Sequence, residues 1–282
     1  MRKKIARQFI IIVLSLLMLC SCTTVSITGR KQLRLVPDSL MHSMSFQQYS
    51  SFLSENKVSS DTSQSEMVKR VGTRIQKAVE KYCAENNCSD LLAGYKWEFN
   101  LVQNDTPNAW AMPGGKVVIY TGILPITQTE AGLAVVMAHE IAHAFARHGA
   151  ERMSHSLLAE LGGAALSVAV KDQPEKTQAL FRQAYGVGAQ VGVLLPYSRI
   201  QESEADHLGL IFMAMAGYDP HEAVDFWQRM KEMSKDKQAP PEFLSTHPAP
   251  DTRIEDIKAL IPEAMKYYEP PSPTISIAAA IR

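Results

Sequence analysis

Two histidines and a glutamate near the middle of the chain have the types and the spacing of a metal site. Positions 139–143 read HEIAH, which places His139 and His143 four residues apart. On a helix, residues at this spacing share a face and can bind one tetrahedral ion. Glu140, beside the first histidine, can act as general base on a metal-activated water. The plainer alternative is a pair of surface or core histidines with a chance glutamate between them.

A zinc ion bound by two histidines alone would be only half-coordinated, so a third protein ligand is required. The acidic stretch at 202–206 contains Glu202 and Asp206, which lie four residues apart on one helical face. One of them can bind the metal, and the other can accept a hydrogen bond from the distal nitrogen of a metal-binding histidine. Glu204 should point away from that face. A solvated helix face is the alternative for such a cluster.

Three other histidines carry weaker signals. His148 and His155 lie off the helical face of His143, and we expect them to face solvent or the edge of the core. His247 lies in a polar stretch before Pro248, which favours extended backbone. Its ring could donate a hydrogen bond to the oxyanion of a tetrahedral intermediate, occupy the open metal position and keep the enzyme silent, or serve the fold alone.

Helices are expected to position these side chains. A capping box at Thr127 and Glu130 predicts the start of the long helix that carries HEIAH. Pro196 opens a second helix, which ends before Gly217 and carries the acidic stretch. Apolar residues at helical spacing predict two more helices within residues 37–83.

Alternating patterns predict strands at 96–102, 108–112 and 116–120. The fold class is therefore α+β, mainly helical, with a small sheet beside the HEIAH helix. An exposed sheet edge near the metal could pair with an extended segment of another chain as an extra strand. We expect this edge at 116–120; ordinary strand packing is the alternative. The residues expected to line it are Asn108, Ala109, Val117, Val118 and Ile119.

Length and composition fit one catalytic domain. The chain has 282 residues, 46% of them hydrophobic. Basic and acidic residues number 29 each, but four basic residues lie in the first seven positions. The rest of the chain has 25 basic against 29 acidic residues. This balance leaves no basic footprint for nucleic acid, so no nucleic-acid partner is expected.

The N-terminus resembles a bacterial lipoprotein signal. Basic residues precede an apolar run at 9–20, which is too short to span a bilayer, and the run leads into LCSC at 19–22. Cleavage before Cys22 would leave this cysteine as the lipid acceptor. An ordinary cleaved signal or an N-terminal anchor helix is the alternative. We therefore predict a signal peptide at 1–21 and a lipidated tether at 22–36, with Thr23 favouring the outer membrane of a bacterial envelope, facing the periplasm.

Export bears on the remaining cysteines, Cys83 and Cys88. They flank a polar turn, and an oxidising compartment favours a local disulfide over a metal site. Two unpaired thiols are the alternative, because a short spacing does not guarantee bridging geometry.

Three separated motifs together resemble metallopeptidase family forty-eight, the HtpX and CAAX prenyl endopeptidase-like zinc peptidases. They are NAWAMPGG at 108–115, HEIAH at 139–143, and Glu202 followed by Ala205 and Asp206. LPYSR at 195–199 and STHP at 245–248 are similar to motifs of its soluble lipoprotein members. The resemblance covers residues 28–261. We expect the zincin-like metallopeptidase domain at 37–269, followed by a loose tail at 270–282.

The resemblance implies one Zn²⁺ per chain, held by His139, His143 and Glu202, with Asp206 supporting a metal-binding histidine. The implied activity is endopeptidase cleavage of polypeptide substrates, with Glu140 as general base. Misfolded or unassembled envelope proteins are the expected substrates. An envelope assembly factor with a mostly latent peptidase and a zinc hydrolase of cell-wall substrates are the alternatives.

Overall fold

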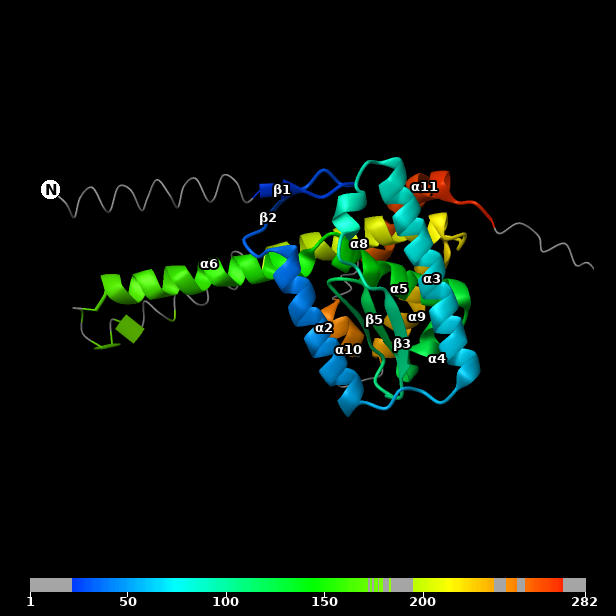
Figure 1. The fold of residues 1–282 in the computed structure, drawn as a ribbon, viewed down its shortest axis with the longest axis horizontal. Helices are drawn as coiled ribbons and strands as arrows, with labels where there is room; N and C mark the ends of the chain where they lie inside the picture. Colours follow the sequence, from blue (N-terminus) through cyan, green and yellow to red (C-terminus); the bar gives the residue numbers. More distant parts are fainter. Residues whose placement is uncertain are drawn as a thin grey trace, which may run out of the picture.

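The computed structural model describes residues 22–171, 173, 175–176, 178–179, 183, 195–235, 242–247 and 252–270. Over these residues helices dominate, and a three-stranded sheet lies among them (Figure 1). This arrangement confirms the predicted α+β class. None of the described helices combines the length and the apolar character needed to cross a bilayer. The predicted signal peptide, and residues 271–282 of the predicted tail, lie outside the described residues.

The described chain begins with a small hairpin. β1 (Cys22–Thr24) pairs antiparallel with β2 (Lys31–Leu33). Arg30, in the loop between them, forms an ion pair with Glu204 at 2.8 Å. The stretch predicted as a tether thus contains an ordered hairpin that contacts the body of the protein. Strands of three residues are too short to produce a readable alternation in the sequence.

Two helices precede the main sheet, as the periodicity predicts. α2 spans Asp38–Glu55 and α3 spans Thr62–Glu85. The Asp61 carboxylate caps α3 by accepting a hydrogen bond from the backbone N–H of Gln64 at 2.9 Å. The buried face of α3 repeats at helical spacing and includes Val68, Val71, Ile75 and Val79.

The main sheet has its last strand in sequence at its centre. The strands are β3 (Glu98–Val102), β4 (Ala109–Met112) and β5 (Lys116–Tyr120). Their order is β3-β5-β4, with β3 parallel and β4 antiparallel to β5.

Because β5 is central, the prediction of a substrate-binding edge at 116–120 is wrong. Val117, Val118 and Ile119 are fully buried. Helix α2 covers the face that contains Val118, and the main core with α3 covers the face that contains Val117 and Ile119. A strand covered on both faces is apolar throughout, which from the sequence alone looks the same at an edge and at a centre.

The helix that carries HEIAH is α5 (Glu130–Phe145), and it packs against α8 (Leu195–Met215). Thr129 caps α5 by accepting a hydrogen bond from the N–H of Gly132 at 2.9 Å, so the predicted cap at Thr127 is two residues early. Gly209 permits the close approach of α8, since a Cβ there would lie 3.1 Å from the backbone nitrogen of His139.

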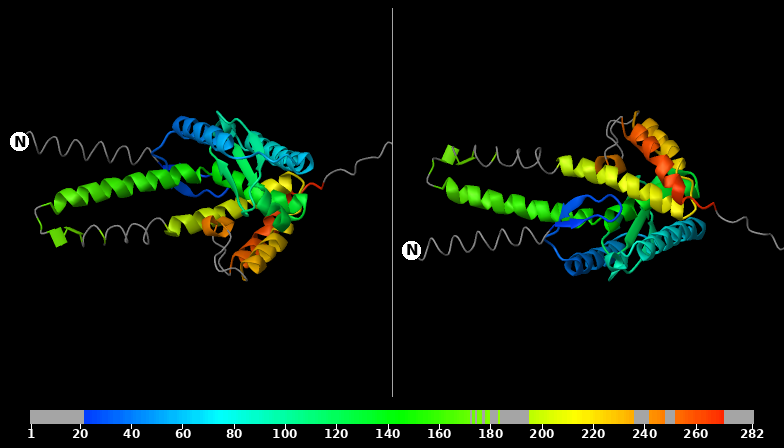
Figure 2. Two further views of the ribbon diagram at one scale, coloured as in Figure 1. Left: turned by 90° about the horizontal axis from the view of Figure 1, so that it is seen from below. Right: turned by 90° about the horizontal axis from the view of Figure 1, so that it is seen from above.

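The remaining helices surround this pair. α6 (His148–Ala169) extends away from the body, and the C-terminal helices lie on the opposite side of α5 from α2 and α3 (Figure 2). The other described elements are η1 (Ser89–Leu92), η2 (Thr121–Ile123), α4 (Leu124–Thr127), α9 (Glu222–Lys235), α10 (Glu242–Thr246), α11 (Arg253–Ala264) and η4 (Met265–Tyr267).

Cys83 and Cys88 are buried free thiols whose sulfur atoms lie 3.0 Å apart. A turn at the end of α3, closed by the N–H of Cys88 donating to the carbonyl of Cys83 at 2.9 Å, brings them together. The predicted disulfide is therefore not present in this structure. Burial raises the pKa of the Cys83 thiol, which disfavours the thiolate through which a disulfide forms.

Candidate metal centre

Four side chains from three parts of the chain converge beside α5. His139 and His143 come from α5, Glu202 from α8 and His247 from the end of α10. Each offers one ligand atom, and the four atoms lie within 4.8 Å of one another. None of the four residues is more than 9% exposed.

The distances within this cluster fit a tetrahedral metal. The Nε2 atoms of His139 and His143 are 3.1 Å apart, and His139 Nε2 lies 3.2 Å from His247 Nδ1. The Glu202 carboxylate oxygens lie 3.0 to 3.4 Å from these nitrogens. Ligand atoms about 2.0 to 2.2 Å from a zinc ion occupy tetrahedral corners that are roughly 3.3 to 3.6 Å apart. The four donors are therefore nearly at the spacing that such an ion requires.

The protonation states of Glu202 and His143 suit ligation as well. Although burial alone would raise it, the neighbouring histidines, His139 above all, hold the pKa of Glu202 well below its usual range. Burial lowers the pKa of His143 well below its ordinary value. Burial also acts to lower the pKa of His139, but the Asp206 and Glu202 carboxylates outweigh it and raise that pKa to about 9. An ionised Glu202 and a neutral His143 are the forms that bind metal, whereas His139 must release a proton to do so.

Glu140 lies beside the cluster but outside it. The residue is 3% exposed, and its Oε1 atom is 3.1 Å from His247 Nε2. Burial raises the pKa of Glu140; the neighbouring histidines and a hydrogen bond from the backbone of Ala111 partly oppose this shift. A carboxylate with a raised pKa next to a group of metal-binding side chains is suited to accept a proton from a water there.

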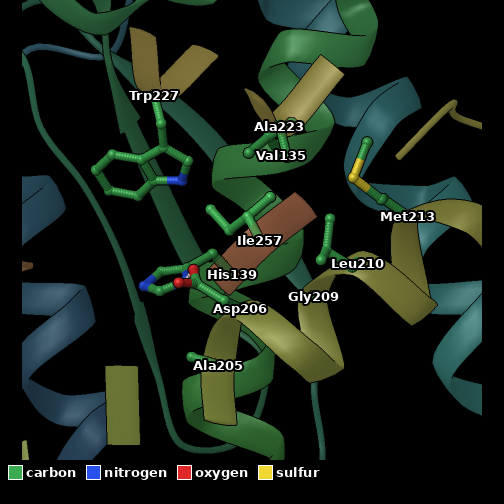
Figure 3. Close-up of a pocket in the computed structure, with 10 residues that line it drawn as sticks. All are labelled: Val135, His139, Ala205, Asp206, Gly209, Leu210, Met213, Ala223, Trp227 and Ile257. Atoms are coloured by element: carbon green, nitrogen blue, oxygen red, sulfur yellow. Dashed lines mark ion pairs between the residues drawn. The ribbon is translucent and has the colours of Figure 1, made fainter. Parts of the chain in front are cut away.

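Asp206 supports His139 from the side opposite the cluster. Its Oδ1 atom lies 2.9 Å from His139 Nδ1, and Figure 3 shows the two side chains pointing toward one another in a pocket that Trp227 also lines. Arg253 donates two hydrogen bonds to Asp206, at 2.7 and 2.9 Å, and stacks on the Trp227 ring. Burial alone would raise the pKa of Asp206, but Arg253 and His139 lower it. The carboxylate is therefore held ionised in the supporting position that the helical spacing allows for.

The expectation that His148 faces solvent or the edge of the core is wrong. His148 is fully buried, and its Nδ1 atom lies 2.7 Å from His143 Nδ1. α5 ends at Phe145, Arg147 adopts a left-handed conformation with φ 57°, and α6 begins at His148. This turn brings His148 back onto His143, so an argument from one continuous helical face fails. The signal that could have revealed this contact is another histidine, His148, only five residues after His143.

Glu204 points away from the metal cluster, as its spacing predicts, but it is not solvated. Its carboxylate lies 2.8 Å from His148 Nε2 and accepts a hydrogen bond from Arg30 at 2.8 Å. Burial alone would raise the pKa of Glu204, but His148, Arg30 and Thr28 lower it to about 2.

Asn108 directly precedes β4 and Ala109 begins it; β4 is an edge strand that packs against α5. Asn108 is buried; its amide donates to Glu242 on α10 at 3.0 Å, and its oxygen accepts from the N–H of Ala109 at 2.9 Å. Asn108 therefore joins this strand to the helix that precedes His247. The side chain of Cys22, the predicted lipid acceptor, lies outside the described residues.

Comparisons with known proteins point to one family. The model of peptidase family M48 matches residues 70–261. The mitochondrial metalloendopeptidase OMA1 of Saccharomyces cerevisiae is 37% identical over 214 residues, which are 72% of this chain and 57% of the relative. Human OMA1 is 32% identical over 251 residues, which are 86% of this chain and 46% of the relative.

A bacterial protein is also similar. The β-barrel assembly-enhancing protease of Yersinia pestis is 34% identical over 169 residues, which are 57% of this chain and 34% of the relative. This chain thus spans about half the length, or less, of the curated relatives it matches.

Proposed function

This chain belongs to peptidase family M48, and on that premise we propose that it is a zinc-dependent endopeptidase of a bacterial cell envelope. The observation that carries the proposal is the cluster of His139, His143 and Glu202 at tetrahedral spacing, with the buried Glu140 beside it. We assign His139, His143 and Glu202 as ligands of one Zn²⁺ per chain, and Glu140 as general base.

A zinc ion held by these residues would lower the pKa of a bound water toward about 7 and would polarise a carbonyl group. Glu140 takes the proton from the attacking water and passes it to the leaving amine. Its raised pKa suits both steps, because a base that titrates nearer to neutral pH can also act as the acid. Asp206, held by Arg253, keeps the Nδ1 side of His139 occupied, so that Nε2 remains directed at the cluster.

Strand β4 can hold the substrate. It is paired with β5 on one side, and the hydrogen bond from the Ala111 backbone to Glu140 supports a substrate-binding edge on its other side. An extended peptide added along β4 would be bound by main-chain hydrogen bonds, with little demand on its side chains. Such binding suits misfolded or unassembled proteins, which expose extended segments.

The resting enzyme is latent in this proposal. His247 lies at the fourth corner of the cluster and also contacts Glu140, so it occupies the position that a water would need. Asn108 ties α10, which precedes His247, to β4, the proposed substrate edge. The notion of an assembly factor with a mostly silent peptidase is therefore compatible with this site.

We further propose a lipid on Cys22, which would anchor the enzyme to the outer membrane facing the periplasm. The sequence at 19–22 and the name of the β-barrel assembly-enhancing relative support an envelope location. Replacing Cys22 with alanine should release the protein from the membrane fraction or block its maturation. Equal fatty-acid labelling of the parent and this variant would contradict the assignment.

The activity is tested by incubating the purified full chain and its His247→Ala variant with an unfolded model protein. Cleavage by either protein that stops with a chelator and returns with zinc supports the proposal. Cleavage that persists in Glu140→Gln would contradict it. Release of cell-wall fragments without proteolysis would instead favour the hydrolase of cell-wall substrates.

A further inference from the structure

The two histidines of α5 have different partners at their outer ring nitrogens. His139 Nδ1 faces the Asp206 carboxylate directly, at 2.9 Å. His143 Nδ1 faces another imidazole, that of His148, at 2.7 Å. On this side the carboxylate is that of Glu204. It is linked to His143 through His148, whose Nε2 atom lies 2.8 Å from it.

The chemistry of these groups determines where the protons lie. An ionised Glu204 can only accept hydrogen bonds, so a neutral His148 donates to it from Nε2. The Nδ1 atom of His148 is then unprotonated, and it accepts a hydrogen bond from the Nδ1–H group of His143. His143 is left with an unprotonated Nε2, the atom that lies 3.1 Å from His139 Nε2 in the metal cluster.

The outer end of this series is held by the N-terminal hairpin. Arg30 donates to Glu204 from Nε at 2.8 Å and pairs with Glu151 through two further hydrogen bonds of 2.8 Å. The Thr28 hydroxyl also donates to Glu204. Arg30 therefore has the same relation to Glu204 that Arg253 has to Asp206. In each pair the arginine keeps the carboxylate ionised and oriented.

We propose that His148, Glu204 and Arg30 form a positioning relay for His143, which holds the ring in the tautomer and orientation that leave Nε2 free for metal. The relay rests on the proposed metal function of the cluster. It makes the hairpin of β1 and β2 part of the support of the metal site, although the two are more than a hundred residues apart in sequence.

Substitutions at His148 test the relay through metal affinity. Zinc binding to the full chain is measured by competition with a chelator, and cobalt substitution reports the ligand geometry through its visible absorption spectrum. His148→Leu removes both hydrogen bonds and should weaken zinc binding about 10 to 100-fold, as loss of an outer partner of a metal-binding histidine typically does. His148→Asn retains an amide oxygen near the position of Nδ1, so it should recover part of this loss. A role in folding alone would not place the two variants in this order when their thermal stabilities without metal are equal.

A matched pair of arginines tests the outer end. Arg30 and Arg229 each pair with a carboxylate, and their side chains are 18% and 23% exposed. Arg30→Met should weaken zinc binding and change the cobalt spectrum. Arg229→Met, whose side chain bonds to Glu222 and to the carbonyls of Ile126 and Thr127, should do neither.

Equal zinc affinity and identical cobalt spectra in the parent, His148→Leu and Arg30→Met would overturn the relay. This result is distinct from failure of the proposed function, in which the parent would bind zinc but cleave no polypeptide even after His247→Ala.

Discussion

The imidazole of His247 bridges Glu202 of the candidate metal centre and Glu140. Its Nε2 atom lies 3.1 Å from Oε1 of Glu140, while its Nδ1 atom lies 3.0 Å from Oε2 of Glu202. Of the roles that the sequence leaves open for His247, this geometry favours the blocking ligand. A donor to the oxyanion would face the substrate, whereas this ring lies between Glu202 and Glu140, where the proposed mechanism requires a water.

Replacing His247 with alanine should therefore raise basal peptidase activity, because a water can then occupy the fourth position. Zinc should be retained, since His139, His143 and Glu202 remain. The measurement is the initial rate of cleavage of an unfolded protein, with zinc content determined on the same samples. A fall in kcat of about 10² to 10³-fold with zinc retained would instead identify an oxyanion donor. Activity within about twofold of the parent, or roughly 0.4 kcal/mol in the barrier, would leave His247 a role in the fold alone.

Replacing Glu140 with glutamine should abolish turnover without loss of metal. The amide keeps the size of the side chain but cannot take a proton, so kcat should fall by at least about 10² to 10⁴-fold. Metal analysis and turnover of the same preparation check both parts. The double variant with His247→Ala serves as the control, because unblocking a site that lacks its base should not restore activity. Normal turnover in Glu140→Gln would contradict the mechanism.

Residues of α8 should differ in their effect on zinc content. Glu202→Ala removes a ligand and should lose zinc. Asp206→Ala removes the support of His139 and should weaken binding about 10 to 100-fold. Ser203→Ala, at an exposed position between the buried glutamates, is the matched control and should bind zinc like the parent. Equal metal content in all three variants would refute the assignment of α8 as the third source of ligands.

Replacement of glycine by alanine should have opposite effects on stability at two helical positions, Gly209 and Gly149. A Cβ at Gly209 would lie 3.1 to 3.2 Å from the backbone of Ala138 and His139, whereas one at Gly149 would meet only side-chain atoms, at 3.8 Å or more. Gly209→Ala should push α8 from α5 and lower both the unfolding temperature and zinc affinity. Gly149→Ala should be neutral or stabilising, by up to about 1 kcal/mol from helix propensity. Thermal unfolding of both variants decides; equal effects would show that α8 does not depend on this close approach.

The ion pair between Asp38 and Arg147 should make the free energy of unfolding depend on pH. Burial alone would raise the pKa of Asp38, but its hydrogen bonds with Arg147, at 2.8 to 3.1 Å, lower it below the unfolded value of 3.8. The unfolded state therefore binds the proton more readily. This contribution is fully present above the unfolded pKa and is lost as pH falls through the lower folded value.

Asp38→Asn should consequently destabilise the protein at about pH 7 and have a smaller effect near about pH 3, below the unfolded pKa, where part of the contribution of the charge is already lost. Urea unfolding of the parent and the variant at both pH values measures the difference. Asp90→Asn, at an exposed position, is the control. A loss of stability that is the same at both pH values would show that the charge of Asp38 is not its cause.

The sequence alone was sufficient wherever the relevant geometry lies within one helix. Residues four apart on a helix share a face, so the proximity of His139 to His143 and of Glu202 to Asp206 follows from their spacing. The same local rules predicted α2, α3 and the strand at 116–120.

Only the tertiary structure decided how these elements meet. The position of β5 at the centre depends on pairing between segments distant in sequence, and strand patterns do not specify partners. His148 reaches His143 because the chain turns at Arg147, where the carboxylate of Asp38, 109 residues away, holds the side chain. Glu204 is buried rather than solvated because Arg30 arrives from a hairpin 174 residues earlier. Helical spacing predicts which way a side chain points, but the partner that it meets there is set by long-range packing.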